Sequence, residues 1–138
     1  MSAPAVAVSH DGRRFAVAWK DVGIGEPNVY WAISNGPSFA EDSLVHDKIW
    51  GTQDHPAIAI DTAGTVWTAW EDERSHPQQI WVRSSAASDK GRAISDRTEG
   101  RASFPAIACN AGLVAVVYET TKEDQHGVTL RLMEYVQK

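Results

Sequence analysis

Asp72 and Arg74 are the side chains whose types and spacing best suit ligand binding. An arginine guanidinium can hold a carboxylate or a sugar acid through two parallel hydrogen bonds, and a neighbouring carboxylate can orient it or take part in proton transfer. The alternative is that Glu71, Asp72 and Arg74 only stabilise their loop, since charged turns commonly bond to their own backbone. Asp21 holds the matching place in an earlier segment, which slightly favours the alternative, because a repeated residue is more often structural.

Three further side chains complete the set of candidates. His76 and Arg101 lie in polar segments between apolar runs, and neither is repeated elsewhere in the chain. Trp50 is also unrepeated and is the best aromatic candidate for stacking on a sugar, although packing remains its slightly favoured role. The predicted ligand-binding residues are therefore Asp21, Trp50, Asp72, Arg74, His76 and Arg101. We assign no catalytic residue.

The chain offers little for a metal ion. Its five histidines are widely separated, so no two of them form a close ligand pair, and each is expected to be a solvated loop residue. They are His10, His46, His55, His76 and His126. The carboxylate run at residues 71–73 lacks the glycine and the spaced ligands of a calcium loop. We expect no metal site and no cofactor.

The balance of charge argues against a nucleic-acid partner. The formal net charge is −5 and the 13 basic residues are scattered, whereas nucleic-acid binding needs clustered Lys and Arg to displace counterions. No apolar stretch is long enough for a membrane span, and the first residues lack the basic leader of a signal peptide, which leaves the cellular compartment open. Cys109 is the single cysteine, so no intrachain disulfide can form, and we expect it to be a small core side chain.

These candidates are positioned by a segment that occurs three times. Its apolar run opens each time on a proline, at Pro4, Pro56 and Pro105, which are spaced 52 and 49 residues apart. A period of about 50 residues with strand-like content is typical of arrays whose units bury their faces against one another, as in propellers and solenoids. The six tryptophans then have a natural explanation, because two of them, Trp19 and Trp70, recur at the same place in the repeat.

Each repeat predicts the same order of strands. A short alternating run is followed by a Gly-containing hairpin turn and a second strand that ends in an aromatic residue. In all three repeats the third strand begins ten residues after that aromatic residue, and a weaker fourth strand follows around 43–46 and 92–95. We therefore expect one all-β domain of three antiparallel blades over about 3–50, 51–100 and 101–138, with the last blade incomplete.

Several motifs resemble the blades of sialidase-like β-propellers of the BNR, or Asp-box, type, over essentially the whole chain. They are the openings HPAIAID and FPAIA, the WEDER that follows a second strand, and IWVRSS before a polar turn. The Asp-box itself is present in degraded form at Ser34–Phe39 and at Ser84–Gly91. The resemblance implies a propeller whose ligand face carries the loops at 20–28, 71–79 and 119–127 and the interblade segments 47–55 and 96–103.

The same resemblance defines what catalysis would require. Sialidases of this family use three arginines on a carboxylate, a Tyr with its Glu, and an Asp as acid and base. Here Arg74 and Arg101 lie on suitable loops, but Arg83 and Arg131 lie on strands, as do all the tyrosines. We expect a non-catalytic binding module, with glycans as the ligand class that the resemblance implies. The alternatives are a sialidase-like glycoside hydrolase, half of a longer propeller enzyme, or a purely structural scaffold.

Three blades predict a partner. Closed propellers have about four to eight blades, so three leave open edges that invite pairing with another chain. We expect two copies to close into a six-bladed homodimer, and the alternative is that the chain is part of a longer propeller. The alternative fold is a β-sandwich, which predicts no equivalence between the three segments.

Overall fold

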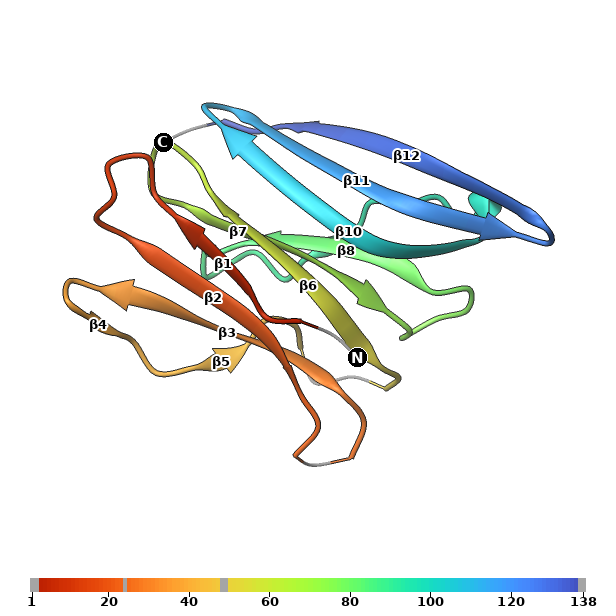
Figure 1. Ribbon diagram of the computed structural model, residues 1–138, viewed down its shortest axis with the longest axis horizontal. Helices are drawn as coiled ribbons and strands as arrows, with labels where there is room; N and C mark the ends of the chain where they lie inside the picture. Colours follow the sequence, from red (N-terminus) through yellow and green to blue (C-terminus); the bar gives the residue numbers. More distant parts are fainter. Residues whose placement is uncertain (1–2, 24, 48–49, 137–138) are drawn as a thin grey trace.

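The computed structural model describes residues 3–23, 25–47 and 50–136, which form an all-β structure of three antiparallel sheets (Figure 1). This confirms the predicted all-β class, and stacked antiparallel sheets are common to blades and to β-sandwiches. The described residues contain no α-helix, and their single helical element is the 3-10 turn η1 (Arg97–Glu99).

Sheet 1 comes from the first repeat. Its strands are β1 (Ala5–Val8), β2 (Phe15–Asp21), β3 (Asn28–Asn35), β4 (Ser38–Phe39) and β5 (Ser43–Leu44). The outer strand expected around 43–46 is the short β5, which pairs with β3. The segment Ser34–Phe39, which resembles an Asp-box in sequence, is a β3–β4 hairpin.

The second and third repeats each form one further sheet. Sheet 2 contains β6 (Gln53–Ile60), β7 (Val66–Asp72), β8 (Gln79–Ser84) and β9 (Arg92–Ala93), and sheet 3 contains β10 (Arg101–Asn110), β11 (Leu113–Lys122) and β12 (Gln125–Glu134). The predicted fourth strand at 92–95 is present as β9, and sheet 3 has three strands within the described residues.

The strand register is the same in all three sheets. The residue after each repeated proline pairs with the residue before the repeated aromatic: Ala5 with Ala18, Ala57 with Ala69, and Ala106 with Val117. The repeated aromatic residues pair in turn with the residues eleven positions later: Trp19 with Tyr30, Trp70 with Trp81, and Tyr118 with Thr129. Residues at the same place in this register are called matching residues below.

The sheets stack in chain order, with sheet 2 between the other two, and their first strands β1, β6 and β10 lie side by side (Figure 1). Sheets 1 and 2 enclose one apolar cluster, which includes Trp31, Ile58 and Trp70. Sheets 2 and 3 enclose a second, which includes Trp67, Val82 and Val116. Alanines on the second strands, Ala16 and Ala18 of β2 and Ala69 of β7, are fully buried between sheets, where small side chains let the packed sheets approach closely.

The third hairpin corrects the sequence prediction. We expected a loop over residues 119–127, but β11 continues to Lys122 and β12 begins at Gln125. The turn consists of Glu123 and Asp124 alone, and Glu123 takes the positive φ of 54° that such a tight turn needs. The β-branched Thr120 and Thr121 extend the strand instead of leaving it. Among the described residues, loops therefore remain at 22–23 and 25–27 after β2 and at 73–78 after β7, whereas β11 and β12 pair up to their turn.

Candidate functional site

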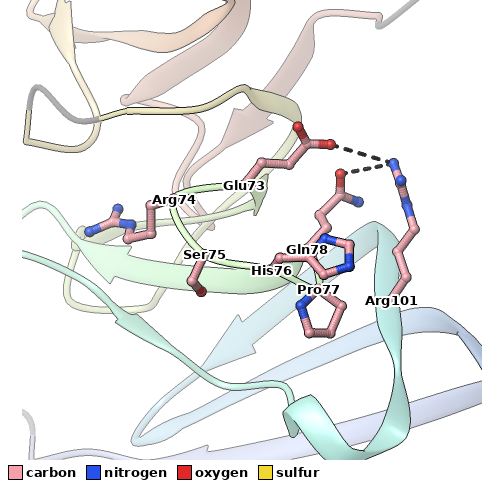
Figure 2. Close-up of a pocket in the computed structure, with 7 residues that line it drawn as sticks. All are labelled: Glu73, Arg74, Ser75, His76, Pro77, Gln78 and Arg101. Atoms are coloured by element: carbon pink, nitrogen blue, oxygen red, sulfur yellow. Dashed lines mark hydrogen bonds and ion pairs between the residues drawn. The ribbon is translucent and has the colours of Figure 1, made fainter.

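The loop between β7 and β8 and the start of β10 enclose a pocket of about 350 Å³ (Figure 2). We call it the Arg101 pocket. It is lined by Glu73, Arg74, Ser75, His76, Pro77, Gln78 and Arg101. Sheet 2 supplies six of these residues and sheet 3 supplies Arg101, so the site exists only because two consecutive repeats pack together.

Asp72 and Arg74 anchor the loop that forms one wall of this pocket. The guanidinium holds the carboxylate at two points, with Nε 2.9 Å from Oδ1 and Nη2 2.8 Å from Oδ2. The Trp70 indole donates a third hydrogen bond to Oδ2 at 2.8 Å. Arg74 also lies over the Trp81 ring, 3.4 Å from its centre, where cation–π attraction adds to the ion pair. This geometry favours the loop-stabilising interpretation of the pair.

The surroundings of Asp72 keep its carboxylate ionised. The residue is fully buried, and burial by itself raises the pKa of a carboxyl group. The hydrogen bonds from Arg74 and Trp70 outweigh that effect, so the pKa of Asp72 lies below its usual value of 3.8. A buried carboxylate whose lone pairs are already occupied cannot also receive a ligand, and Figure 2 shows the Arg74 side chain pointing away from the other polar groups of the pocket.

Gln78 joins the loop to sheet 3. Its carbonyl accepts a hydrogen bond from the Ala102 N–H at 3.0 Å, and its Nε2 donates to the Ala102 carbonyl at 2.8 Å. Its Oε1 accepts from Arg101 Nη2 at 3.0 Å. The Arg97 guanidinium adds a bond to the carbonyl of His76. The pocket walls are therefore held from both sides, which is how a binding site is preorganised.

Arg101 is a charged group that remains accessible in this pocket. Its side chain is 57% exposed, and Nη2 lies 3.7 Å from Oε1 of the half-exposed Glu73. Figure 2 shows Glu73 and Gln78 both directed at the guanidinium. A guanidinium carries five N–H donors, so donors remain for a ligand beside those used by Gln78 and Glu73. Exposed ion pairs of this kind are weak and can be exchanged for a ligand at low cost.

The structure gathers only part of the predicted set. Arg74, His76 and Arg101 line the pocket, whereas Asp21 and Trp50 do not. Asp21 is exposed and its Oδ1 accepts from the Gly23 N–H at 2.6 Å. Trp50 is 88% exposed, so the packing role that we slightly favoured is wrong: the ring is left almost entirely open to solvent.

Sequence reasoning missed Gln78, the residue that positions Arg101. Its signal lies in the repeat, because Pro27 holds the matching place and its carbonyl accepts from the Gln53 N–H as that of Gln78 accepts from Ala102. The two carbonyls thus mark where each sheet meets the next. The amide side chain is unique to the second repeat, and nothing local to the sequence shows that it faces an arginine 23 residues later.

His46 corrects the expectation that every histidine is solvated. It is buried, and its Nε2 accepts a hydrogen bond from the Val29 N–H at 3.2 Å while Nδ1 lies 2.9 Å from the Asp47 carbonyl. Burial lowers the pKa of His46 below 6.5, which keeps the ring neutral. The matching residue Ser95 accepts from the Ile80 N–H in the same way, so the position caps a strand end.

Cys109 was expected to be a small core side chain. Cys109 is half-buried against the second apolar cluster, and burial raises the pKa of its thiol to about 11. Such a thiol is a packing group and a poor nucleophile.

Among residues 3–23, 25–47 and 50–136, no group of three potential His, Cys, Asp or Glu ligands is arranged around a common point.

The arginines considered for catalysis are bound in separate places. Arg83 lies over Trp31 and donates to the Val45 carbonyl, while Arg131 pairs with Glu99 at 2.6 Å. The tyrosines are equally dispersed: Tyr30 stacks on Trp19, Tyr118 is buried, and the Tyr135 hydroxyl donates to Asp61. Neither group contributes to the Arg101 pocket.

A scan against protein-family models finds no match for this chain, and a search of curated proteins finds none either. No helix among the described residues is long and apolar enough to cross a membrane.

Proposed function

We propose that this protein is a non-catalytic binding module, that its sheets are consecutive blades of a β-propeller, and that the Arg101 pocket takes an acidic glycan. One observation carries the proposal. Arg101 presents an exposed guanidinium in a polar pocket, positioned by the buried Gln78 and by Glu73. Planar guanidinium groups suit carboxylates, which acidic sugars carry on an otherwise hydroxyl-rich ring.

The blade arrangement rests on the repeated register and on the stacking order. Three sheets with the same pairings follow one another in chain order, and their first strands lie innermost. A sandwich would not require matching residues in each sheet, whereas blades that descend from one repeat do.

Binding is favoured over glycoside hydrolysis by the content of the pocket. Hydrolysis of a glycosidic bond ordinarily needs two carboxyl groups on opposite sides of the scissile bond. Glu73 is the one carboxylate in the lining of the Arg101 pocket, and Asp72 beneath it is buried and saturated. A sialidase-like hydrolase is the alternative and would need further arginines from elsewhere. Half of a longer propeller enzyme is compatible with the same blades, since flanking blades could supply them.

A glycan array that includes sialylated and uronic-acid ligands, run with a fluorogenic sialoside assay, tests the proposal. We expect binding of acidic glycans without turnover. Arg101→Ala should weaken that binding about tenfold or more, because it removes a charge-assisted hydrogen bond worth about 1.5–3 kcal/mol. Arg92→Ala is the matched control, since Arg92 is exposed on β9 and does not line the pocket.

Three outcomes would contradict the proposal. Sialoside turnover that Arg101→Ala abolishes would show an enzyme. Glycan binding that survives Arg101→Ala unchanged would place the site elsewhere. Failure to bind any glycan would leave the scaffold alternative as the better explanation of the fold.

A further inference from the structure

The outward face of sheet 3 is apolar and uncovered. Along β12, Val128, Leu130 and Leu132 point to solvent and are 73%, 57% and 60% exposed. The residues that alternate with them are Thr129 and Arg131, which bond to Glu99, and Met133, which packs against the cluster shared with sheet 2. The strand therefore turns Thr129, Arg131 and Met133 toward sheet 2 and presents aliphatic side chains outward, whereas a solvated sheet face is ordinarily polar.

The residues that match Val128 and Leu130 in the other two sheets are buried. Val29 and Trp31 on β3 are buried beneath sheet 2, and Ile80 and Val82 on β8 are buried beneath sheet 3. These positions are the ones that each sheet uses to pack on the sheet that follows. Sheet 3 retains their apolar character without a following sheet, so its outer face continues an interface that the molecule already builds twice.

The opposite end of the stack shows the complementary face. Val6, Val8 and Phe15 of sheet 1 are 66%, 51% and 41% exposed. The residues that match them in sheet 2 are Ile58, Ile60 and Val66, all of which are buried against sheet 1. Sheet 3 thus exposes the face that sheets 1 and 2 pack on the sheet after them. Sheet 1 exposes the face that sheets 2 and 3 pack on the sheet before them.

The total surface agrees with two uncovered faces. The protein exposes 8093 Å², whereas a compact monomer of 15.1 kDa is expected to expose about 7,100 Å². The excess of about 1,000 Å² is of the size that one partner buries in a stable interface, roughly 800 Å².

The residue after the repeated aromatic makes a polar contact with the following sheet at both interfaces, although the partners differ. Lys20 of sheet 1 pairs with Asp54 of sheet 2 at 3.1 Å, and the matching Glu71 of sheet 2 accepts a hydrogen bond from the Phe104 N–H of sheet 3 at 2.7 Å. Glu119 is the matching residue of sheet 3 and is exposed. Ala3 matches Phe104, since each stands directly before a repeated proline.

We propose that a second copy of this chain covers both faces, with sheet 3 of each copy packed on sheet 1 of the other. In this assembly Glu119 accepts a hydrogen bond from the Ala3 N–H of the second copy, as Glu71 accepts one from Phe104. The interface joins two different surfaces, so two copies form two identical seams and close a ring of six sheets. The inference rests on the blade arrangement in the proposed function and is independent of the ligand in the Arg101 pocket.

Sedimentation equilibrium of the 138-residue chain tests the assembly directly. We expect twice the monomer mass of 15.1 kDa, with no larger species. A monomer would overturn the proposal, and would leave further sheets of a longer polypeptide as the cover. A ladder of higher multiples would also overturn it, because it would mean that the head-to-tail contact does not close.

Charged substitutions on β1 and β12 test whether these two surfaces form the dimer interface. Val6→Lys and Leu130→Glu each place a charge in both seams of the dimer, and each should weaken dimerisation about 100-fold or more, because an unpaired charge would be buried there. Both side chains are exposed within one chain, so circular dichroism should show that the variants fold. Val22→Lys is the control, because Val22 is exposed in a loop outside both faces and its substitution should leave the mass unchanged.

Mixing the two variants separates head-to-tail pairing from other dimers. A mixed dimer has one unaltered seam and one seam in which the lysine introduced on β1 faces the glutamate introduced on β12. We expect mixing to restore dimers to within about tenfold of the wild-type affinity, since opposite charges then meet. No recovery, or a dimer that neither substitution weakens, would overturn the proposed surfaces. Arg101→Ala should weaken glycan binding without changing the mass of the dimer, because the pocket lies outside the proposed interface. Failure of one proposal can then be distinguished from failure of the other.

Discussion

Sheet 2 and sheet 3 are built from the same repeat, yet their central strands are buried differently. All seven residues of β7 are buried, including Thr68, Glu71 and Asp72. In β11 the matching residues alternate between buried and accessible. Sheet 2 has a sheet on each face and sheet 3 has one, so the difference lies in the neighbours and not in the strands. A residue's place in the repeat determines which face of its sheet the side chain points to. Whether that face is buried depends on the presence of a neighbouring sheet.

Full burial makes the polar residues of β7 dependent on internal partners. Thr68 donates to the Ala57 carbonyl at 2.9 Å, while Glu71 lies 3.0 Å from His55 Nδ1 and accepts from the Phe104 N–H. A buried polar group without a partner costs about 1–3 kcal/mol, so each of these bonds is required. In sheet 3 the matching Glu119 is exposed and can bond to water. Substitutions at matching residues should therefore separate the covered sheet from sheets with an open face.

The largest difference is expected at the repeated aromatic residue. Trp70→Ala should lower the free energy of unfolding by about 3–5 kcal/mol, because it empties a fully buried site and removes a hydrogen bond to Asp72. In the Leu130→Glu background, in which the faces of sheets 1 and 3 stay uncovered, Trp19→Ala on the open face of sheet 1 should cost about 1 kcal/mol. Urea unfolding followed by far-UV circular dichroism measures both. Equal losses would mean that the open face is covered as well as the buried one.

The repeated aspartates should differ next. Asp72→Asn should destabilise the fold by about 1–3 kcal/mol at neutral pH, since it weakens the bonds from Arg74 and Trp70 in a buried site. Asp21→Asn should change stability by less than about 0.5 kcal/mol, because Asp21 is exposed. The same urea titrations measure this pair, and a cost at Asp21 as large as that at Asp72 would contradict the assignment.

The pKa of Asp72 gives this comparison a pH signature. Because the folded pKa lies below 3.8, the stability that the carboxylate contributes is present above pH 3.8 and is lost as the pH falls through the folded value. The gap between wild type and Asp72→Asn should therefore shrink in acid. A constant gap from neutral pH down to the lowest pH at which the protein folds would mean that ionisation of Asp72 contributes nothing.

The smallest effect concerns the strand-end cap that is His46 in the first repeat and Ser95 in the second. Burial lowers the pKa of His46 in the fold, so below pH 6.5 the unfolded chain takes up a proton that the folded chain resists. Stability should be fully present above pH 6.5 and should fall as the pH drops toward the folded pKa, by up to about 1.4 kcal/mol per pH unit.

His46→Ser tests this cap with the residue that the second repeat already uses. The serine hydroxyl can accept the Val29 N–H as Ser95 accepts that of Ile80 at 2.9 Å, so the strand end stays capped. The variant should lose part of the pH dependence below 6.5, whatever it loses in packing against Trp70. An unchanged slope of stability against pH in urea titrations would exclude His46 as the source.

Much of the fold could be predicted from local pattern. Alternation, the hairpin glycines and the fixed spacing from aromatic residue to third strand predicted the strands and their order, because these signals act over a few residues. The prediction of a loop at 119–127 was wrong. The segment has the same length as the loops of the other repeats, but Thr120 and Thr121 continue the strand pairing, and comparing the repeats did not show this. The candidate site was predicted less completely, because it lies between two sheets.

The sequence by itself determined three repeats, their all-β character and the direction in which each side chain points from its sheet, since these follow from residue type and a period of two. Only the tertiary structure decided that Asp72 is buried while Asp21 is exposed, that His46 is enclosed, and that Gln78 meets Arg101. Those outcomes depend on which sheet lies across each face. Contacts between residues far apart in the chain depend on how the sheets pack. The sequence pattern of one repeat does not show which residues of the neighbouring sheet it will contact.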